Sequence, residues 1–136
     1  MIITHVIYSG LGGQGDYLFP LLRQDKNKSF KKNIIIFYGV EKILKNYKYF
    51  CLKNNIEFYF IDSKKIFSWL DYFKILRRIK PNIIFIHTSV VIKTFLFSFF
   101  FNVKTIFVDH ASNKVKKISD WINIFFSFSL LRKIIF

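Results

Sequence analysis

The chain alternates between short apolar runs and longer segments in which apolar and polar residues are mixed. The apolar runs are rich in Ile, Val, Phe and Tyr and carry few polar breaks, which is typical of parallel strands covered on both faces. We therefore predict five strands, at Ile2–Tyr8, Asn33–Tyr38, Glu57–Ile61, Asn82–His87 and Lys104–Asp109.

The segments between these runs are long enough for helices. The predicted helices are Asp16–Gln24, Val40–Asn54, Ile66–Lys80 and Val90–Phe101. Pro81 is expected to end the third helix, because a proline disfavours helical backbone in the residue before it. The repeated strand–helix order predicts an α/β fold with an open, mostly parallel, Rossmann-like sheet, helices on both faces and strand order 3-2-1-4-5.

The last part of the chain continues this pattern. Lys116–Leu131 is predicted to form a further helix, and Lys133–Phe136 reads as the opening of a sixth strand. We expect one domain over residues 1–136, incomplete at its carboxyl end.

A glycine-rich turn, Ser9–Asp16, joins the first strand to the first helix. Gly10, Gly12 and Gly15 match the G-x-G-x-x-G pattern of dinucleotide-binding sites. That pattern also requires an acidic residue closing the second strand, and we assign Glu41 to the start of the next helix instead. The turn therefore indicates either a site for an anionic or hydroxyl-rich ligand or only close strand–helix packing.

Polar residues also follow the fourth and fifth predicted strands, as His87–Ser89 and Asp109–Lys114. In a doubly wound sheet these segments share one edge with the glycine turn. His110 is the strongest candidate there, because an imidazole can position a phosphate or hydroxyl or accept a proton. His110 and His87 could equally be hydrogen-bonded to neighbouring loops, whereas His5 is expected in the core.

A metal site built from His87, Asp109 and His110 would lack the regular spacing of known ligand motifs, and we predict no metal. The sequence contains no Walker motif, nucleophile elbow or cysteine–histidine zinc pattern. Cys51 is the one cysteine, so an internal disulfide is excluded and a reducing compartment is favoured.

The net charge is +14, from 22 Lys and Arg against 8 Asp and Glu. Such a charge suggests an anionic partner, although abundant Lys, Asn, Ile, Phe and Tyr with one alanine also fit AT-rich coding DNA. Specific nucleic-acid binding is not expected, because the aromatic residues lie within apolar runs. In the second predicted helix Ile43, Leu44, Tyr47 and Cys51 share one face, and the other face carries Lys42, Lys45, Lys48 and Lys53.

That lysine face is either simply solvated or adsorbs to an anionic membrane surface. Thr94–Phe101 is almost entirely apolar, and it could be covered by its own sheet, by another domain or by lipid. It is too short to span a bilayer, as is Ile122–Leu131. No signal peptide is visible, since an apolar strand pattern begins at Ile2.

Three segments together resemble the amino-terminal domain of GT-B glycosyltransferases, the retaining family 4 type in particular. They are Ile2–Tyr8 with Gly12-Gly13-Gln14-Gly15, then Pro81–His87, then Lys104–Ser112. The resemblance implies an acceptor-binding domain of an enzyme that transfers a sugar from a nucleotide-sugar to a glycan or lipid-linked acceptor in cell-surface polysaccharide synthesis. It implies no cofactor, since the nucleotide-sugar is a substrate.

By position, the resemblance gives His110 a catalytic role, with Ser112 beside it. The substrate-binding residues expected at this edge are Gly12, Gly13, Gln14, Gly15, His87, Thr88, Ser112 and Lys114. The family's carboxyl-terminal donor-binding domain has no counterpart in this sequence, so we expect the chain alone to be inactive.

Family members of this type often lie on the inner face of the cell membrane, which implies a cytoplasmic, peripheral location. Two alternatives remain open. One is a Rossmann-type nucleotide-binding module, and the other is a non-catalytic basic protein that binds membrane surfaces.

Overall fold

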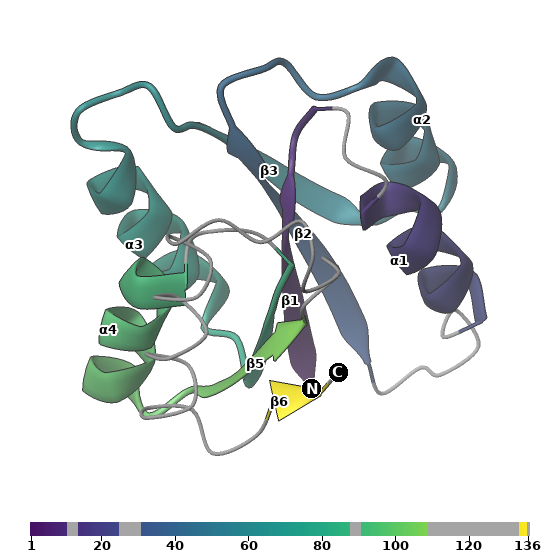
Figure 1. The fold of residues 1–136 in the computed structure, drawn as a ribbon. Helices are drawn as coiled ribbons and strands as arrows, with labels where there is room; N and C mark the ends of the chain where they lie inside the picture. Colours follow the sequence, from purple (N-terminus) through teal and green to yellow (C-terminus); the bar gives the residue numbers. More distant parts are fainter. Residues whose placement is uncertain (11–13, 25–30, 88–90, 109–133, 136) are drawn as a thin grey trace, which may run out of the picture.

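The computed structural model describes residues 1–10, 14–24, 31–87, 91–108 and 134–135. Their strands form an all-parallel sheet in the order β3-β2-β1-β4-β5-β6 (Figure 1). The strands are β1 (Ile2–Tyr8), β2 (Lys32–Gly39), β3 (Glu57–Asp62), β4 (Ile83–Ile86), β5 (Lys104–Val108) and β6 (Ile134–Ile135). This order confirms the predicted open, Rossmann-like α/β sheet.

Helices cover both faces of the sheet, as predicted (Figure 1). They are α1 (Gln14–Gln24), α2 (Lys45–Lys53), α3 (Ser68–Ile79) and α4 (Val91–Phe101). One core cluster joins α1 and α2 to the sheet through Leu18, Phe19 and Phe50. The second joins α3 and α4 to the opposite face through Tyr72 and Phe97. We refer to these as the α1–α2 layer and the α3–α4 layer.

The strand β2 shows why the strands read as continuous apolar runs. Every residue from Ile34 to Tyr38 is buried. Successive side chains of a strand point to opposite faces, so Ile35 and Phe37 enter the α1–α2 core while Ile34 and Ile36 enter the other. Because both faces are covered, a polar group in this run is tolerated only when it is hydrogen-bonded, as the Tyr38 hydroxyl is to Ser68.

The predicted start of the second helix was wrong. Helix α2 begins at Lys45, not at Val40, so Glu41 and Lys42 lie in the connection that precedes it. The connection is held by tertiary hydrogen bonds instead of helical ones. The Ser9 hydroxyl donates to the carbonyl of Glu41 (2.7 Å), and the N–H of Leu44 donates to the carbonyl of Ser9 (3.2 Å).

Helix α3 begins two residues later than predicted, because the residues before Ser68 form turns. It ends at Ile79, just before Pro81, as the position of that proline predicts. Lys80, between them, has a left-handed backbone conformation (φ 52°). The predicted helix Lys116–Leu131 lies outside the described residues. Within the described part of the chain, no helix has the length and hydropathy needed to cross a bilayer.

Candidate functional site

The carboxyl ends of β1, β2 and β4 form the edge of the sheet at which a ligand is expected. Strand order reverses between β1 and β4, since β2 follows on one side of β1 and β4 lies on the other. In doubly wound sheets ligands bind outside the carboxyl ends of the strands at this reversal. We call this the β1–β4 edge.

Gln14, at the start of α1, joins the two strands of that edge. Its side-chain Oε1 accepts a hydrogen bond from the N–H of Tyr8 (2.7 Å), the last residue of β1. Its Nε2 donates to the backbone carbonyl of His87, which directly follows β4. Both ends of this amide are therefore occupied by backbone groups. Gln14 fixes the helix start between the strand ends, a bracing role that its sequence position alone did not reveal.

Glu41 and Tyr8 meet beside the glycine turn. The pKa of Tyr8 is raised, mainly by partial burial and to a smaller extent by the charge of Glu41 and a hydrogen bond to it. The hydroxyl therefore stays protonated and can donate to the carboxylate. The carboxylate also lies against Gly10, where a Cβ atom would collide with Glu41 Oε2. A side chain at position 10 would therefore displace the Glu41 carboxylate from this place. The exposed residue Glu41 presents an acceptor for hydroxyl groups at this edge.

Sequence reasoning missed both of these side chains. Glu41 was assigned to a helix, and Tyr8 was treated only as the end of a strand. One signal could have found them: a glycine follows each of the first two predicted strands, Gly10 and Gly39. Glycines at strand ends often mark a place where another group approaches the backbone closely. Glu41 lies two positions after Gly39, at this edge of the sheet.

Gly15 serves the packing of α1 against α2. Its N–H donates to the hydroxyl of Tyr47 (3.3 Å), and a Cβ atom here would lie 2.5 Å from Cζ of that ring. Phe19, one turn further along α1, packs edge-on against the same Tyr47. This geometry accounts for Gly15 without any ligand. The role of Gly15 in substrate binding stays a prediction.

Two buried histidines lie near the same edge, His5 on β1 and His87 directly after β4. His5 Nδ1 and His87 Nε2 are 3.4 Å apart, and His5 stacks on Phe85 with 5.1 Å between ring centroids. His5 is buried as predicted, but its pairing with His87 was not foreseen. The register could have shown it, because His5 lies opposite Phe85 and diagonal to His87. At this distance one ring donates a hydrogen bond that the other accepts.

The remaining predicted site residues lie outside the described part of the chain: Gly12, Gly13, Thr88, His110, Ser112 and Lys114. The structure therefore brings Gln14, Gly15 and His87 to one edge and says nothing of the others. Among the described residues, no group of three or more His, Cys, Asp or Glu side chains could hold a metal ion.

Two further groups are not part of this edge. Cys51 is fully buried in the α1–α2 core, and burial raises the pKa of its thiol to about 12, so it is not a nucleophile near neutral pH. Lys45, Lys48 and Lys53 are exposed on α2, while Lys42 is exposed in the connection before it.

Comparison with known proteins adds no assignment. No protein-family model matches the chain, and no curated protein is significantly similar to it.

Proposed function

We propose that the chain binds a sugar or nucleotide-sugar at the β1–β4 edge, as the acceptor-binding half of a glycosyltransferase acting on a glycan or lipid-linked acceptor. The observation that carries this proposal is the exposed Glu41 carboxylate, held beside Tyr8 and Gly10 at the carboxyl edge of β1 and β2. A carboxylate accepts hydrogen bonds from sugar hydroxyls, and an adjacent tyrosine ring adds an apolar face.

The other parts of the proposal follow from the same edge. Backbone N–H groups of the glycine turn and the start of α1 suit the phosphates of a nucleotide-sugar. In the proposed enzyme His110, with Ser112 and Lys114, positions the reacting sugar, and Gly12, Gly13, Thr88 and His87 complete the binding surface. Transfer also requires a donor-binding domain, and no resident cofactor takes part.

The test is ligand-observed NMR on the whole chain with UDP-glucose, UDP-N-acetylglucosamine and a neutral oligosaccharide. We expect saturation transfer to sugar protons, and a loss of signal of about tenfold in Glu41→Gln, because a carboxylate hydrogen bond is replaced by a weaker amide one. Tyr8→Phe should have a smaller effect. Glu57→Gln is the matched control, since that exposed carboxylate lies at the amino end of β3.

Equal losses in the Glu41 and Glu57 variants, or no saturation transfer from any of these ligands, would overturn the proposal. Circular dichroism of each variant should match the unchanged protein, because both carboxylates are exposed.

The position of Glu41 also favours a second candidate, a nucleotide-binding module. Dinucleotide sites use an acidic residue after the second strand to accept hydrogen bonds from ribose hydroxyls, and Glu41 lies two residues beyond the end of β2 against the first glycine of the turn. NAD and AMP distinguish the candidates. Binding of AMP that is lost with 2′,3′-dideoxy-AMP, without binding of any sugar, would favour the nucleotide module.

A further inference from the structure

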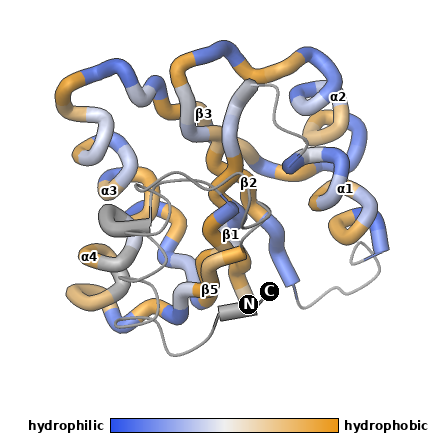
Figure 2. Tube along the Cα trace, viewed as in Figure 1, coloured by the Kyte–Doolittle hydropathy of each residue, from blue (hydrophilic) through white to orange (hydrophobic). Residues whose placement is uncertain are grey.

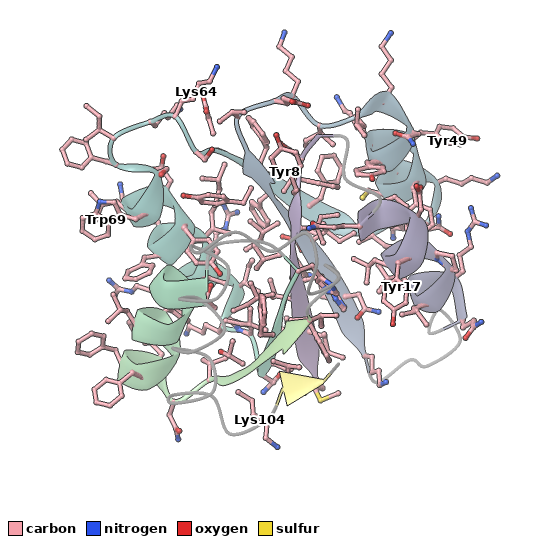
Figure 3. The ribbon with its side chains drawn as sticks, viewed as in Figure 1. Tyr8, Tyr17, Tyr49, Lys64, Trp69 and Lys104 are labelled. Carbon is pink, nitrogen blue, oxygen red and sulfur yellow. The ribbon has the colours of Figure 1, made fainter. Side chains whose placement is uncertain are left out.

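The connection between β3 and α3 exposes a group of large apolar side chains. Ile66 is 85% exposed and Phe67 is 63% exposed, and Trp69 and Leu70 in the first turn of α3 are exposed as well. We call these four residues the apolar tip. Lys64 and Lys65 directly precede it, and Figure 2 shows the hydrophobic bend next to this hydrophilic stretch. In Figure 3 the labelled Trp69 and Lys64 both point away from the sheet.

The backbone of this connection is well defined by hydrogen bonds, so the exposure is built into the fold. The N–H of Lys64 donates to the Asp62 carboxylate (3.0 Å), and the N–H of Ser68 donates to the carbonyl of Lys65 (3.0 Å). The N–H of Leu70 then donates to the carbonyl of Phe67 (2.9 Å). These turns hold Ile66 and Phe67 away from the core.

Phe67 also occupies a position where a polar residue would stabilise the helix. It is the N-cap residue of α3, and no side chain caps the helix there. Ser, Thr, Asp or Asn at an N-cap typically stabilises a helix by about 1 kcal/mol. An aromatic residue at this point neither caps the helix nor is buried in the core. The apolar tip is therefore a surface on which a partner could gain apolar contacts.

We propose that the apolar tip inserts into the headgroup region of an anionic membrane, with Lys64 and Lys65 binding lipid phosphates. Adjacent aromatic, aliphatic and lysine side chains are the combination that binds such interfaces. The net charge of +14 favours an anionic surface and opposes pairing of the tip with a second copy of the chain.

A row of ring contacts connects the tip to the buried core of the α3–α4 layer. Neighbouring ring centroids lie 5.9 Å apart for Trp69 and Phe73, 5.7 Å for Phe73 and Phe97, and 4.5 Å for Phe97 and Phe101. The end of α4 adds further exposed side chains, Leu96, Phe99, Phe100 and Phe101. Helices α3 and α4 lie on the same side of the molecule (Figure 1), so this side can face one membrane surface.

The tip lies at the same edge of the sheet as the candidate site. The N–H of Ser63 donates to the carbonyl of Gly39 (2.9 Å), which ties the start of the connection to the end of β2. If the proposed function holds, a membrane contact here brings a lipid-linked acceptor to the Glu41 carboxylate. The membrane contact itself does not depend on sugar transfer.

The experiment is co-sedimentation with vesicles of phosphatidylcholine alone or with about 30% of the anionic lipid phosphatidylglycerol added, which gives the surface a negative potential. We expect binding only to the anionic vesicles, weakened about tenfold or more in Ile66→Ser/Phe67→Ser, because two apolar side chains leave the interface. The matched control is Lys45→Gln/Lys48→Gln/Lys53→Gln on α2, expected to weaken binding less than the tip variant. Thermal unfolding of the tip variant should occur at the same or a slightly higher temperature, since both side chains are exposed and a serine at position 67 can cap α3.

Three results would overturn the proposal: no binding to anionic vesicles, full binding by the tip variant, or a larger loss in the α2 lysine variant. The protein and the tip variant could also bind a DNA oligonucleotide equally well, and as tightly as the anionic vesicles. That result would indicate general polyanion binding and overturn the proposal. Failure of the proposed function is seen separately, because Glu41→Gln should remove sugar binding and leave vesicle binding intact.

Discussion

The two helical layers bury similar side chains but present different surfaces to solvent. On the α1–α2 layer the exposed residues Tyr49 and Leu52 alternate with lysines, and the Lys53 ammonium lies 5.8 Å from the Tyr49 ring centroid. On the α3–α4 layer the apolar tip and the end of α4 expose neighbouring apolar residues. A single sheet constrains both inner faces, so this difference arises on the outside, where the fold makes no demand.

The inner faces differ in a smaller way. The α1–α2 core is held by ring packing, with Phe19 and Phe50 stacked at 4.1 Å between centroids. The α3–α4 core adds buried hydroxyl pairs, Tyr38 with Ser68 and Tyr72 with Thr94. Burying a hydroxyl is tolerated only when it is hydrogen-bonded, so these pairs fix the positions of α3 and α4 more specifically than ring packing does.

The largest effect on stability is expected for a substitution inside the α3–α4 layer, compared with one on its outer surface. Phe97 is 2% exposed and Phe99 is 74% exposed on the same helix. Phe97→Ala should lower the free energy of unfolding by about 3–5 kcal/mol, because it removes a buried ring and leaves a cavity. Phe99→Ala should change it by less than about 0.5 kcal/mol. Urea denaturation measures both, and similar losses would show that Phe99 is covered in the folded protein.

The next effect concerns the α1–α2 layer. Alanine normally stabilises a helix relative to glycine by about 1 kcal/mol. Gly15→Ala should instead destabilise the protein by about 1–3 kcal/mol, because the added methyl group overlaps Tyr47. The double variant Gly15→Ala/Tyr47→Leu should lose less than the sum of the single losses, since the smaller side chain makes room. Stabilisation by Gly15→Ala would contradict the close packing of α1 against α2.

A moderate effect is expected for the hydroxyl pairs. The Tyr72 hydroxyl lies 2.6 Å from Thr94 Oγ1, and burial raises its pKa, so it is a neutral hydrogen-bonding group. Tyr72→Phe should cost about 1–2 kcal/mol in unfolding free energy. Tyr49→Phe, at an exposed ring of the other layer, should cost almost nothing. Equal values from chemical denaturation would show that the buried Tyr72–Thr94 hydroxyl pair does not stabilise the α3–α4 core.

The sequence predicts the sheet better than it predicts the bounds of the helices. The apolar runs predicted the sheet well, because parallel strands such as β2 are covered on both faces and require unbroken apolar sequence. The bounds of α2 could not be read the same way. They depend on hydrogen bonds with Ser9, more than thirty positions earlier: its hydroxyl donates to the carbonyl of Glu41, and its carbonyl accepts from the N–H of Leu44.

The candidate site was only partly predictable for the same reason. Gly15 and His87 were placed at the right edge because they follow strands whose ends meet. Glu41 and its contact with Gly10, like the brace formed by Gln14, are tertiary contacts that no local pattern encodes. Such contacts become readable only once the strand order and register are known.

The smallest effect is expected outside both layers, at an ion pair on the sheet. Lys32 Nζ lies 2.6 Å from Glu57 Oε2, and both side chains are solvent-accessible. Glu57→Gln should therefore cost only about 0.2–1 kcal/mol, far less than a change inside either core. Urea denaturation at neutral pH measures this difference, with high salt as a check, because added salt should reduce it.

The pH dependence of this pair has a defined sign. Hydrogen bonds from Lys32 and Tyr59 lower the pKa of Glu57, so the folded protein binds fewer protons than the unfolded chain in mildly acidic solution. The stabilisation is therefore present above the ordinary carboxyl range and is lost as the pH falls through the lowered pKa. The difference in unfolding free energy between the unchanged protein and Glu57→Gln should shrink towards zero once the pH falls below the lowered pKa of Glu57. A difference that persists or grows in acid would show that Glu57 contributes through packing and not through its charge.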